Sequence, residues 1–177
     1  MATPGETSAD IFQPGGRLRD DLLTPEAGAA LRESIRLTRA TRWDTVRSPH
    51  VFMGLLAAPD AGVKNWGERL RADLQTLLAQ FQELFHQEEG ENEPTLALHR
   101  EFLSDNVIRL LRDSLHRAKN HHRPVITSMD LLITLLTAAN SIVADVFGRI
   151  GVTAAKLTEY AVMAEQSCGD ERGHGAR

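Results

Sequence analysis

The chain has 177 residues, of which 42% are hydrophobic, with a formal net charge of −4 and a single cysteine, Cys168. This length suits one domain, or two small halves with a shared core. The lone thiol excludes an internal disulfide and a thiolate zinc site, and the negative charge gives no overall attraction to nucleic acid or acidic lipid. No apolar run reaches the roughly 18 residues of a membrane span, so we expect a cytoplasmic protein.

Residues 1–22 are rich in Gly, Pro, Ser and Thr and predict an irregular N-terminal arm. The arm has one apolar pair, Ile11-Phe12. Either this pair docks in a groove of the domain, or it is a chance pair in a disordered tail. We favour the second interpretation.

Residues 23–86 predict a first unit of four helices. Thr24 suits the capping position of the first helix, and Pro25 suits its first turn, where a proline loses no helical hydrogen bond. The second helix is expected to begin at Ser48, whose hydroxyl can accept a first-turn N–H. A short third helix follows, and Asp73 is expected to cap the fourth.

An acidic segment, residues 87–101, has no apolar periodicity and is predicted to be a linker. Residues 102–166 then predict the same four helices again, with Ser104 and Ser128 at the starts of the first two. The final residues, 167–177, contain three glycines and no hydrophobic pattern, and are predicted to be a flexible tail.

The two units are copies of each other. Without a gap, residues 23–77 align with residues 103–157, and 11 of the 55 pairs are identical. Unrelated sequences of ordinary composition would share roughly three to four. A repeat of this length indicates an architecture built from two similar units.

The sequence therefore predicts an all-α fold in which two four-helix repeats, related by a pseudo-twofold axis, pack against each other. No segment alternates apolar and polar residues for long, as a half-buried strand would. Three pairs of identical leucines are expected to be buried at equivalent positions: Leu31 with Leu111, Leu56 with Leu136, and Leu77 with Leu157.

This plan resembles the Clp N-terminal domain, the double-repeat N-domain of Hsp100 AAA+ chaperones of the ClpA, ClpB, ClpC and ClpV types. The resemblance spans about residues 23–163. It implies a mobile module that has no active site and delivers proteins to an ATP-driven ring in bacterial protein quality control. The stretches that carry it are Leu23-Thr24-Pro25-Glu26-Ala27, Ser48-Pro49-His50-Val51-Phe52-Met53-Gly54-Leu55-Leu56, Leu103-Ser104-Asp105, Ile126-Thr127-Ser128-Met129-Asp130-Leu131-Leu132 and Ile150-Gly151-Val152.

The chain departs from that family in three respects. It has no G-x-x-x-x-G-K-[ST] phosphate loop, so ATPase activity is not expected. Pro49 and Met129 stand where ClpC-type domains have the glutamate that recognises phosphoarginine, which argues against that ligand. An apolar patch of ClpB-type domains would fall on Asp113, Arg117 and Asp130, so this groove would be polar here.

No catalytic, cofactor-binding or metal-binding residue is predicted, and the chain is expected not to be an enzyme. Among the closest histidines, His116, His121 and His122, the first two are five residues apart instead of the four of a helical metal pair, and no acidic or thiol ligand completes the set. Ser34 and Ser114 occupy matching helix positions, where packing or a hydrogen bond within the helix is the expected role.

An arginine-rich stripe runs along the first helix of each repeat. It is either a solvated face or a docking surface for an acidic partner. Trp43 is the best contact candidate, because the second repeat has Arg123 there and the shared core does not require an aromatic ring. Leu37 is expected to border the same patch, although both side chains could instead pack against the other repeat. The predicted partner-binding residues are Arg32, Arg36, Leu37, Arg39, Trp43 and Arg47.

The leading hypothesis is a non-catalytic protein-interaction module for a Clp/Hsp100 unfoldase or a ClpV-type sheath-recycling machine, either standalone or as its N-domain. The expected partner is a protein segment with acidic and apolar residues, without cofactor or membrane, and the chain is expected to be a monomer or weak dimer. The alternatives are a small nucleic-acid-associated protein, since arginine stripes suit phosphates, and a small helical enzyme, which would need a pocket of converging titratable groups.

Overall fold

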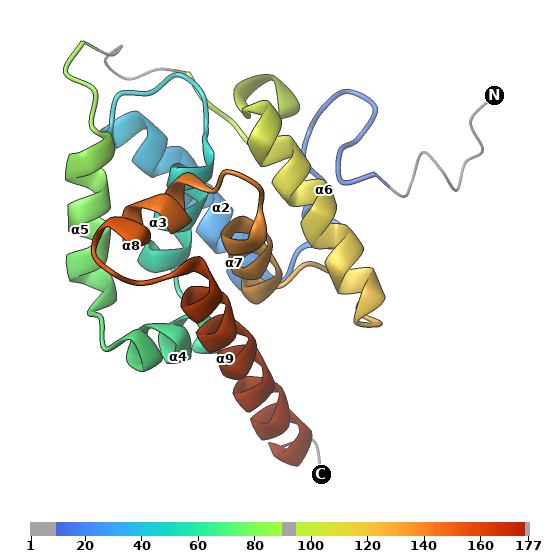
Figure 1. The fold of residues 1–177 in the computed structure, drawn as a ribbon. Helices are drawn as coiled ribbons and strands as arrows, with labels where there is room; N and C mark the ends of the chain where they lie inside the picture. The colour runs from blue at the N-terminus through green and yellow to red at the C-terminus, as the bar shows by residue number, and fades with distance from the viewer. Residues whose placement is uncertain (1–9, 90–94, 176–177) are drawn as a thin grey trace.

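The computed structural model describes residues 10–89 and 95–175, which contain eight α-helices, two short 3-10 helices and no β-strand (Figure 1). The predicted all-α class is confirmed. The first repeat contains α2 (Pro25–Ala40), α3 (Ser48–Ala57), α4 (Ala61–Leu70) and α5 (Leu74–Phe85). The second contains α6 (Asp105–Asn120), α7 (Ser128–Thr137), α8 (Ile142–Arg149) and α9 (Ala154–Gly175). The 3-10 helices η1 (Asp20–Leu22) and η2 (Arg100–Phe102) precede α2 and α6.

Three helices, α2, α5 and α6, begin at the capping residues that the sequence predicts. The Thr24 hydroxyl accepts a hydrogen bond from the Ala27 amide at 3.1 Å, and the Ser104 hydroxyl accepts one from the Val107 amide at 3.2 Å. The fourth helices, α5 and α9, are capped in the same way. Each cap satisfies an amide that has no partner within its helix.

Capping of the second helices differs from the prediction. Ser48 and Ser128 lie one position inside α3 and α7, and the capping residues are Arg47 and Thr127. The Ser128 side chain is fully buried, and its hydroxyl has no hydrogen-bond partner among the described residues. These serines therefore lie in the first turn and do not cap it.

The second helix of each repeat lies at the centre of the fold (Figure 1). Eight of the ten residues in α3, and eight of the ten in α7, are buried. The three predicted leucine pairs are also confirmed as buried, because none of these six side chains exposes more than 8% of its surface. A central helix buried on all sides accounts for the near-continuous apolar sequence of these segments.

Four aromatic rings link the repeats. The ring centroid of Phe147, in α8, lies 6.0 Å from that of Phe52, 6.1 Å from that of Trp66 and 6.0 Å from that of Phe81. Trp66 also donates its indole N–H to the Leu157 carbonyl oxygen of α9 at 3.1 Å. The halves thus share one core, in agreement with the prediction that the two repeats pack against each other.

Two backbone contacts tie the repeats together reciprocally. Leu23 pairs in parallel with Ile126, and Leu103 pairs in parallel with Val46. Each contact comprises one hydrogen bond of 2.8 Å and one of 3.0 Å. Since each residue of the first contact is equivalent to one of the second, 80 positions away, the same contact is made twice about a pseudo-twofold axis.

The structural equivalence begins upstream of residue 23. The starts of η1 and η2 are 80 residues apart, and each 3-10 helix leads into the first helix of its repeat. Just before them, the Leu18 amide donates a hydrogen bond to the Leu98 carbonyl oxygen at 3.0 Å. Leu18 and Leu98 are themselves equivalent, so the pseudo-twofold axis passes close to this pair.

The end of the N-terminal arm docks on the domain. Ile11 exposes 0% of its surface, Phe12 exposes 3% and Leu18 exposes 2%. Phe12 pairs in antiparallel fashion with Leu18, so the chain doubles back on itself before η1. The favoured interpretation of Ile11-Phe12 as a chance pair in a disordered tail is therefore wrong, and the docking interpretation is confirmed. Residues 1–9 of the arm lie outside the described residues.

The end of the chain also differs from the prediction. The sequence predicts a flexible tail from residue 167, but α9 continues to Gly175. Extending an existing helix costs far less than starting one, so α9 can run past its last buried residue without an apolar face. The end of α9 therefore cannot be located from the point where the hydrophobic pattern stops.

Among the described residues, no single helix is long and apolar enough to cross a membrane. Taken together, α7 and α8 have the length and composition of such a span, but the pair bends by 71° at its break. Both helices also contribute buried side chains to the core.

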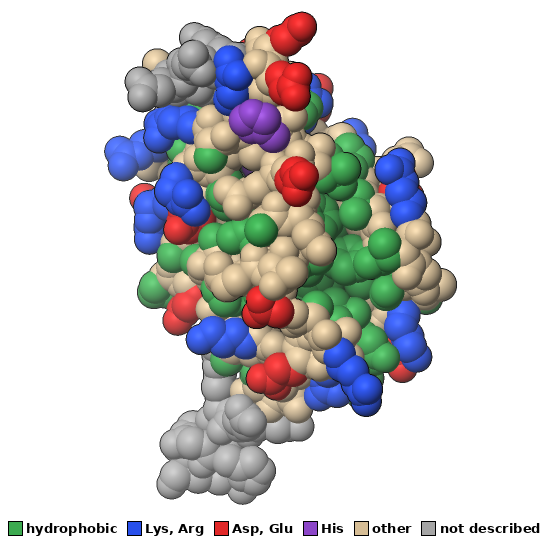
Figure 2. Space-filling view, turned by 90° about the vertical axis from the view of Figure 1, so that its left-hand side faces the viewer, with side chains coloured by type: hydrophobic (Ala, Val, Ile, Leu, Met, Phe, Trp, Pro, Cys, Tyr) green, Lys and Arg blue, Asp and Glu red, His purple; other side chains and the backbone are tan. Residues whose placement is uncertain are grey.

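Hydrophobic side chains gather in a hollow on the side of the molecule where α5 and α8 lie (Figure 2). The pseudo-symmetry is broken here, because α4 packs closely along α9 whereas the equivalent pair, α8 and α5, makes much less contact. The reason is side-chain size: Ala161 and Ala164 of α9 stand where α5 has Phe81 and Leu84. Leu84 is consequently 54% exposed, while Ala164 is fully buried.

We expect Leu136→Ala to lower the free energy of unfolding by about 2–5 kcal/mol, because it removes a core side chain that is 2% exposed and leaves a cavity. Met163→Ala is the control, since this side chain is 40% exposed and its loss should change stability by no more than about 0.5 kcal/mol. Urea unfolding followed by circular dichroism measures both. Equal effects of the two substitutions would contradict the placement of α7 in the core.

Candidate functional site

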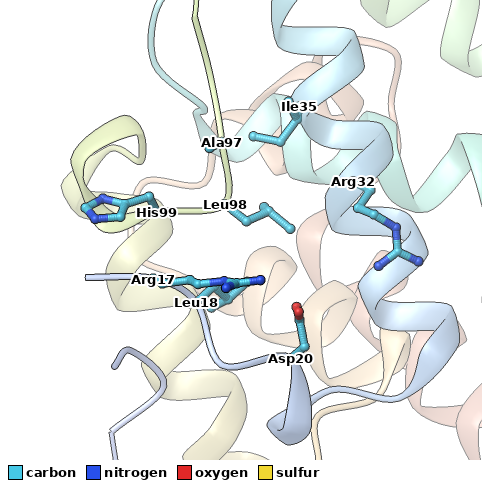
Figure 3. Close-up of a pocket in the computed structure, with 8 residues that line it drawn as sticks. All are labelled: Arg17, Leu18, Asp20, Arg32, Ile35, Ala97, Leu98 and His99. Atoms are coloured by element: carbon cyan, nitrogen blue, oxygen red, sulfur yellow. The ribbon is translucent and has the colours of Figure 1, made fainter. Parts of the chain in front are cut away.

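A groove lies beside the first helix of the first repeat, and we call it the α2 groove. Its cavity of about 560 Å³ lies between α2, the end of the arm and the segment that precedes η2 (Figure 3). The residues that line it are Arg17, Leu18, Asp20, Arg32, Ile35, Ala97, Leu98 and His99.

The α2 groove has an apolar end and a charged end. Figure 3 shows Ile35 and Leu98 toward one end, with the guanidinium of Arg17 and the carboxylate of Asp20 toward the other, facing Arg32 across the opening. Among the described residues, none of these three charged side chains forms an ion pair or hydrogen bond. Two guanidiniums beside one carboxylate leave the groove net positive.

The wall of the groove is held by the contact between arm and linker. The Nε2 atom of His99 and the Gly15 carbonyl oxygen are 2.8 Å apart, and the Glu101 amide donates to Nδ1 of the same ring at 3.1 Å. Gly16 has a φ of +98°, and a Cβ there would lie 2.7 Å from the His99 ring. Only glycine fits this turn, which fixes where the arm meets the linker.

The structure separates the predicted arginines. Arg32 lines the α2 groove, whereas the Nε of Arg36 pairs with Glu33 at 2.5 Å on the helix surface. Arg39 donates to the Leu96 carbonyl oxygen at 2.9 Å and so anchors the linker to α2. Of these three side chains, Arg32 alone faces the cavity.

The prediction that Leu37 borders a surface patch is wrong, because its side chain is 0% exposed. Leu37 shares a helix face with Ala30 and Ser34, and this face packs against α3. The approach there is so close that a Cβ on Gly54 would lie 2.2 Å from the Ala30 carbonyl oxygen. The arginine pattern on α2 concealed this second buried face.

Trp43 and Arg47 lie together at the other end of α2. The indole N–H of Trp43 donates to the Phe85 carbonyl oxygen at 2.6 Å, and the Arg47 guanidinium lies 5.0 Å from the Trp43 ring centroid. The half-buried ring thus braces the end of α5. A partner-binding role for Trp43 and Arg47 stays a prediction.

No model of a known protein family matches the sequence, and no curated protein matches it. Solved structures do match. The N-terminal domain of the chaperone ClpD from Arabidopsis thaliana superposes with a TM-score of 0.58 at 15% identity, over 85% of this chain and 99% of that chain. A structure described as "Preliminary structural investigations of a malarial protein secretion system" superposes with a TM-score of 0.62 at 11% identity, over 80% of this chain and 93% of that chain.

The fold is Clp N-domain-like. The all-helical architecture and the nearly complete coverage of the ClpD domain agree on this. At these identities the likeness is one of fold alone.

The Clp-N-like domain has two equivalent buried polar sites, one in each repeat. In the first, the Arg47 amide donates to Nδ1 of His50 at 3.0 Å, and Nε2 of His50 lies 3.1 Å from the Thr41 hydroxyl oxygen. Thr41 itself donates to the Leu37 carbonyl oxygen, so its oxygen accepts from the His50 ring. The first contact requires a neutral ring, because Nδ1 accepts there and so carries no proton. Burial, together with the charge of Arg47, lowers the pKa of His50 from 6.5 to about 4.

In the second repeat Asp130 takes the place of His50 and is fully buried. Its carboxylate binds Arg123 and Arg117, with a 2.7 Å contact to the latter, and accepts the Thr127 amide at 2.9 Å. Glu165 binds Arg117 in turn, at 2.8 and 2.9 Å. Burial raises the pKa of Asp130, but these hydrogen bonds outweigh it and hold the pKa below its usual range. The polar second-repeat site is thus a closed ionic network.

The described residues contain no group of three or more His, Cys, Asp and Glu side chains that could hold a metal ion. Sequence reasoning missed most of the α2 groove. It identified Arg32, but it left Arg17, Asp20 and His99 in segments assigned to an arm and a linker. Leu18 and Leu98 are leucines 80 positions apart, the same offset that relates the two repeats, and this is the signal that could have placed those segments in the repeat.

We expect the buried His50 to make stability depend on pH. Because its pKa is lower in the folded state than the ordinary value of 6.5, the unfolded chain binds more protons between pH 6.5 and about 4. The stability from neutral His50 is present above pH 6.5 and is lost as pH falls toward 4, by about 3 kcal/mol in total. Urea unfolding of wild type and His50→Gln across this range measures the difference. Parallel pH curves for the two proteins would contradict the buried neutral ring.

Proposed function

We propose that this chain is a non-catalytic protein-recognition module that serves a Clp/Hsp100 AAA+ unfoldase or a ClpV-type sheath-recycling machine. It acts as a standalone adaptor or as the N-domain of such a machine. The partner segment binds in the α2 groove. The observation that carries the proposal is the combination, in one cavity, of an apolar end and two guanidiniums that have no partner among the described residues.

The Clp N-domain-like fold supports the general role, and the chemistry of the groove supports the kind of partner. Ile35 and Leu98 offer an apolar contact, which favours an aliphatic or aromatic side chain. Arg17 and Arg32 favour acidic groups next to that side chain, since guanidinium forms strong paired hydrogen bonds with carboxylate. This is the acidic and apolar segment that the sequence predicts, bound nearer the start of α2 than Trp43.

The experiment is a titration of short fluorescent peptides with one leucine between two glutamates on a Gly/Ser background. We expect saturable binding that weakens when lysines replace the glutamates or glycine replaces the leucine. Binding should also weaken with salt, since exposed charges are screened beyond about 10 Å at 0.1 M.

Arg32→Glu should weaken peptide binding roughly tenfold, because it turns an attraction of up to about 1 kcal/mol into a repulsion of similar size. Arg36→Glu is the matched control: it has the same charge change on the same helix, but Arg36 lies outside the groove. If both variants bind equally well, or equally poorly, the groove is not the site.

A further inference from the structure

The second repeat has its own version of the α2 groove. Shifting the groove residues by 80 positions gives a site beside α6 that includes Arg112 in place of Arg32 and Leu115 in place of Ile35. Leu18 and Leu98 are equivalent to each other and lie on either side of the axis, so each leucine has in one site the position that the other has in the second site. The two sites are therefore related by the same pseudo-twofold axis that relates the helices.

This second groove is filled by the arm of the chain itself. Asp10 pairs with the Nε of Arg112 at 3.2 Å, and the guanidiniums of Arg100 and Arg112 each lie 5.8 Å from the Phe12 ring centroid. Ile11, between Asp10 and Phe12, is fully buried. An acidic, an aliphatic and an aromatic residue in sequence thus occupy the α6 site.

The arm also pairs through its backbone. The Gln13 amide donates to the Arg17 carbonyl oxygen at 2.8 Å, and the Arg19 amide donates to the Ile11 carbonyl oxygen at 2.9 Å. The equivalents of Arg17 and Arg19 beside the α2 groove are Ala97 and His99. There the His99 amide bonds to the Ala97 carbonyl oxygen, two residues back, at 2.8 Å. The Ala97 carbonyl and the His99 amide thus correspond to the two groups that bind the arm on the other side. Here they are bonded to each other, and no added strand pairs with them among the described residues.

We propose that the α2 groove binds an extended partner segment with an acidic, an aliphatic and an aromatic residue in succession, in the manner of Asp10-Ile11-Phe12. The acidic residue pairs with Arg32 as Asp10 does with Arg112, and the segment adds as an antiparallel strand to residues 97–99. This rests on the proposed function and names its ligand.

The occupant is a segment of another protein and not the arm of a second copy. Ile11 and Phe12 are already buried in their own groove, and Arg112 holds Asp10 there. The α2 groove also differs from the α6 groove at one charged position, and this difference narrows the expected sequence of the partner segment. Asp20 replaces Arg100, so a basic residue near the aromatic side chain is favoured in the partner and an acidic one is not.

The probe is a synthetic peptide with the arm sequence Asp-Ile-Phe-Gln, flanked by glycines and labelled with a fluorophore. Titration into the full chain should show tighter binding than for the same residues in scrambled order or with Lys in place of Asp. Two-dimensional NMR of the isotope-labelled chain should place the largest amide shifts at residues 97–99. Methylating the backbone nitrogen of the peptide glutamine, whose equivalent in the arm donates to the Arg17 carbonyl oxygen, should weaken the binding.

The matched variants are Arg32→Glu and Arg112→Glu, identical changes at equivalent positions. Arg32→Glu should weaken peptide binding roughly tenfold. Arg112→Glu should leave peptide affinity unchanged and instead raise hydrogen exchange in residues 10–13. The reverse result, with Arg112→Glu alone affecting the peptide, would mean that the peptide displaces the arm and would overturn the inference.

The inference and the proposed function fail in different ways. If the Leu peptides flanked by Glu bind through Arg32 but the Asp-Ile-Phe-Gln peptide binds no better than its scrambled form, the function stands and the strand-like ligand is wrong. If neither class of peptide binds, both are wrong.

Discussion

The reciprocal backbone pairing of Leu23 with Ile126 and of Leu103 with Val46 is the constraint on which the arrangement of this molecule depends. In each contact, the residue just before the first helix of one repeat bonds to the loop just before the second helix of the other. Neither pair can form within a single repeat, so each half needs the other to complete its backbone hydrogen bonds. The pairing also fixes the register in which the central helices meet and in which η1 and η2 precede α2 and α6.

The same axis explains why two grooves exist and why they differ. Leu18 and Leu98 meet at the axis, so the segments around them form a wall for a groove on each side. On the α6 side the chain continues from its arm and covers the apolar surface with Ile11 and Phe12. The segment that would play this part on the α2 side precedes residue 95, and residues 90–94 lie outside the described residues. Among the described residues, an upstream segment of the chain therefore covers the α6 surface but not the α2 surface.

Much of the scaffold could be predicted from the sequence, because it depends on local chemistry and on periodicity. The caps at Thr24, Ser104 and Asp73 and the buried faces of α3 and α7 follow from residue type and spacing. Duplication added a second, independent signal, since chance seldom places identical leucines at equivalent positions twice. The second buried face of α2, which contains Leu37, could not be predicted from the sequence. Small residues such as Ala30 allow another helix to approach closely, but they do not identify which helix does so.

The site was harder to predict, because its residues come from segments without periodicity. Arg17, Asp20 and His99 meet only through the Leu18–Leu98 pairing, a contact between residues 80 positions apart. The arginine pattern on α2 did contain Arg32, but it gave no means of separating this residue from Arg36, which pairs within the helix, or Arg39, which holds the linker. That separation depends on the path of the linker, which the sequence leaves open.

The two buried polar sites show how the repeats could diverge without losing their common backbone. His50 and Asp130 both accept the amide of the capping residue, so the start of the central helix is preserved. A neutral imidazole can be surrounded by Leu37 and Trp43, whereas a buried carboxylate requires cations, and Arg117 and Arg123 stand at those two equivalent positions.

Replacing Arg117 or Arg123 alone would take one cation from the buried carboxylate, and an arginine placed in the first set alone would bring a guanidinium against the buried imidazole. Either change would cost several kcal/mol. The ionic set also includes Glu165 of α9. Its equivalent on α5 is Phe85, whose backbone carbonyl oxygen accepts the Trp43 indole N–H. The two repeats therefore differ at all four of these positions. Because they link the first, second and fourth helices of each repeat, the divergence gave α9 ionic contacts where α5 has aromatic ones, while the central helices stayed in place.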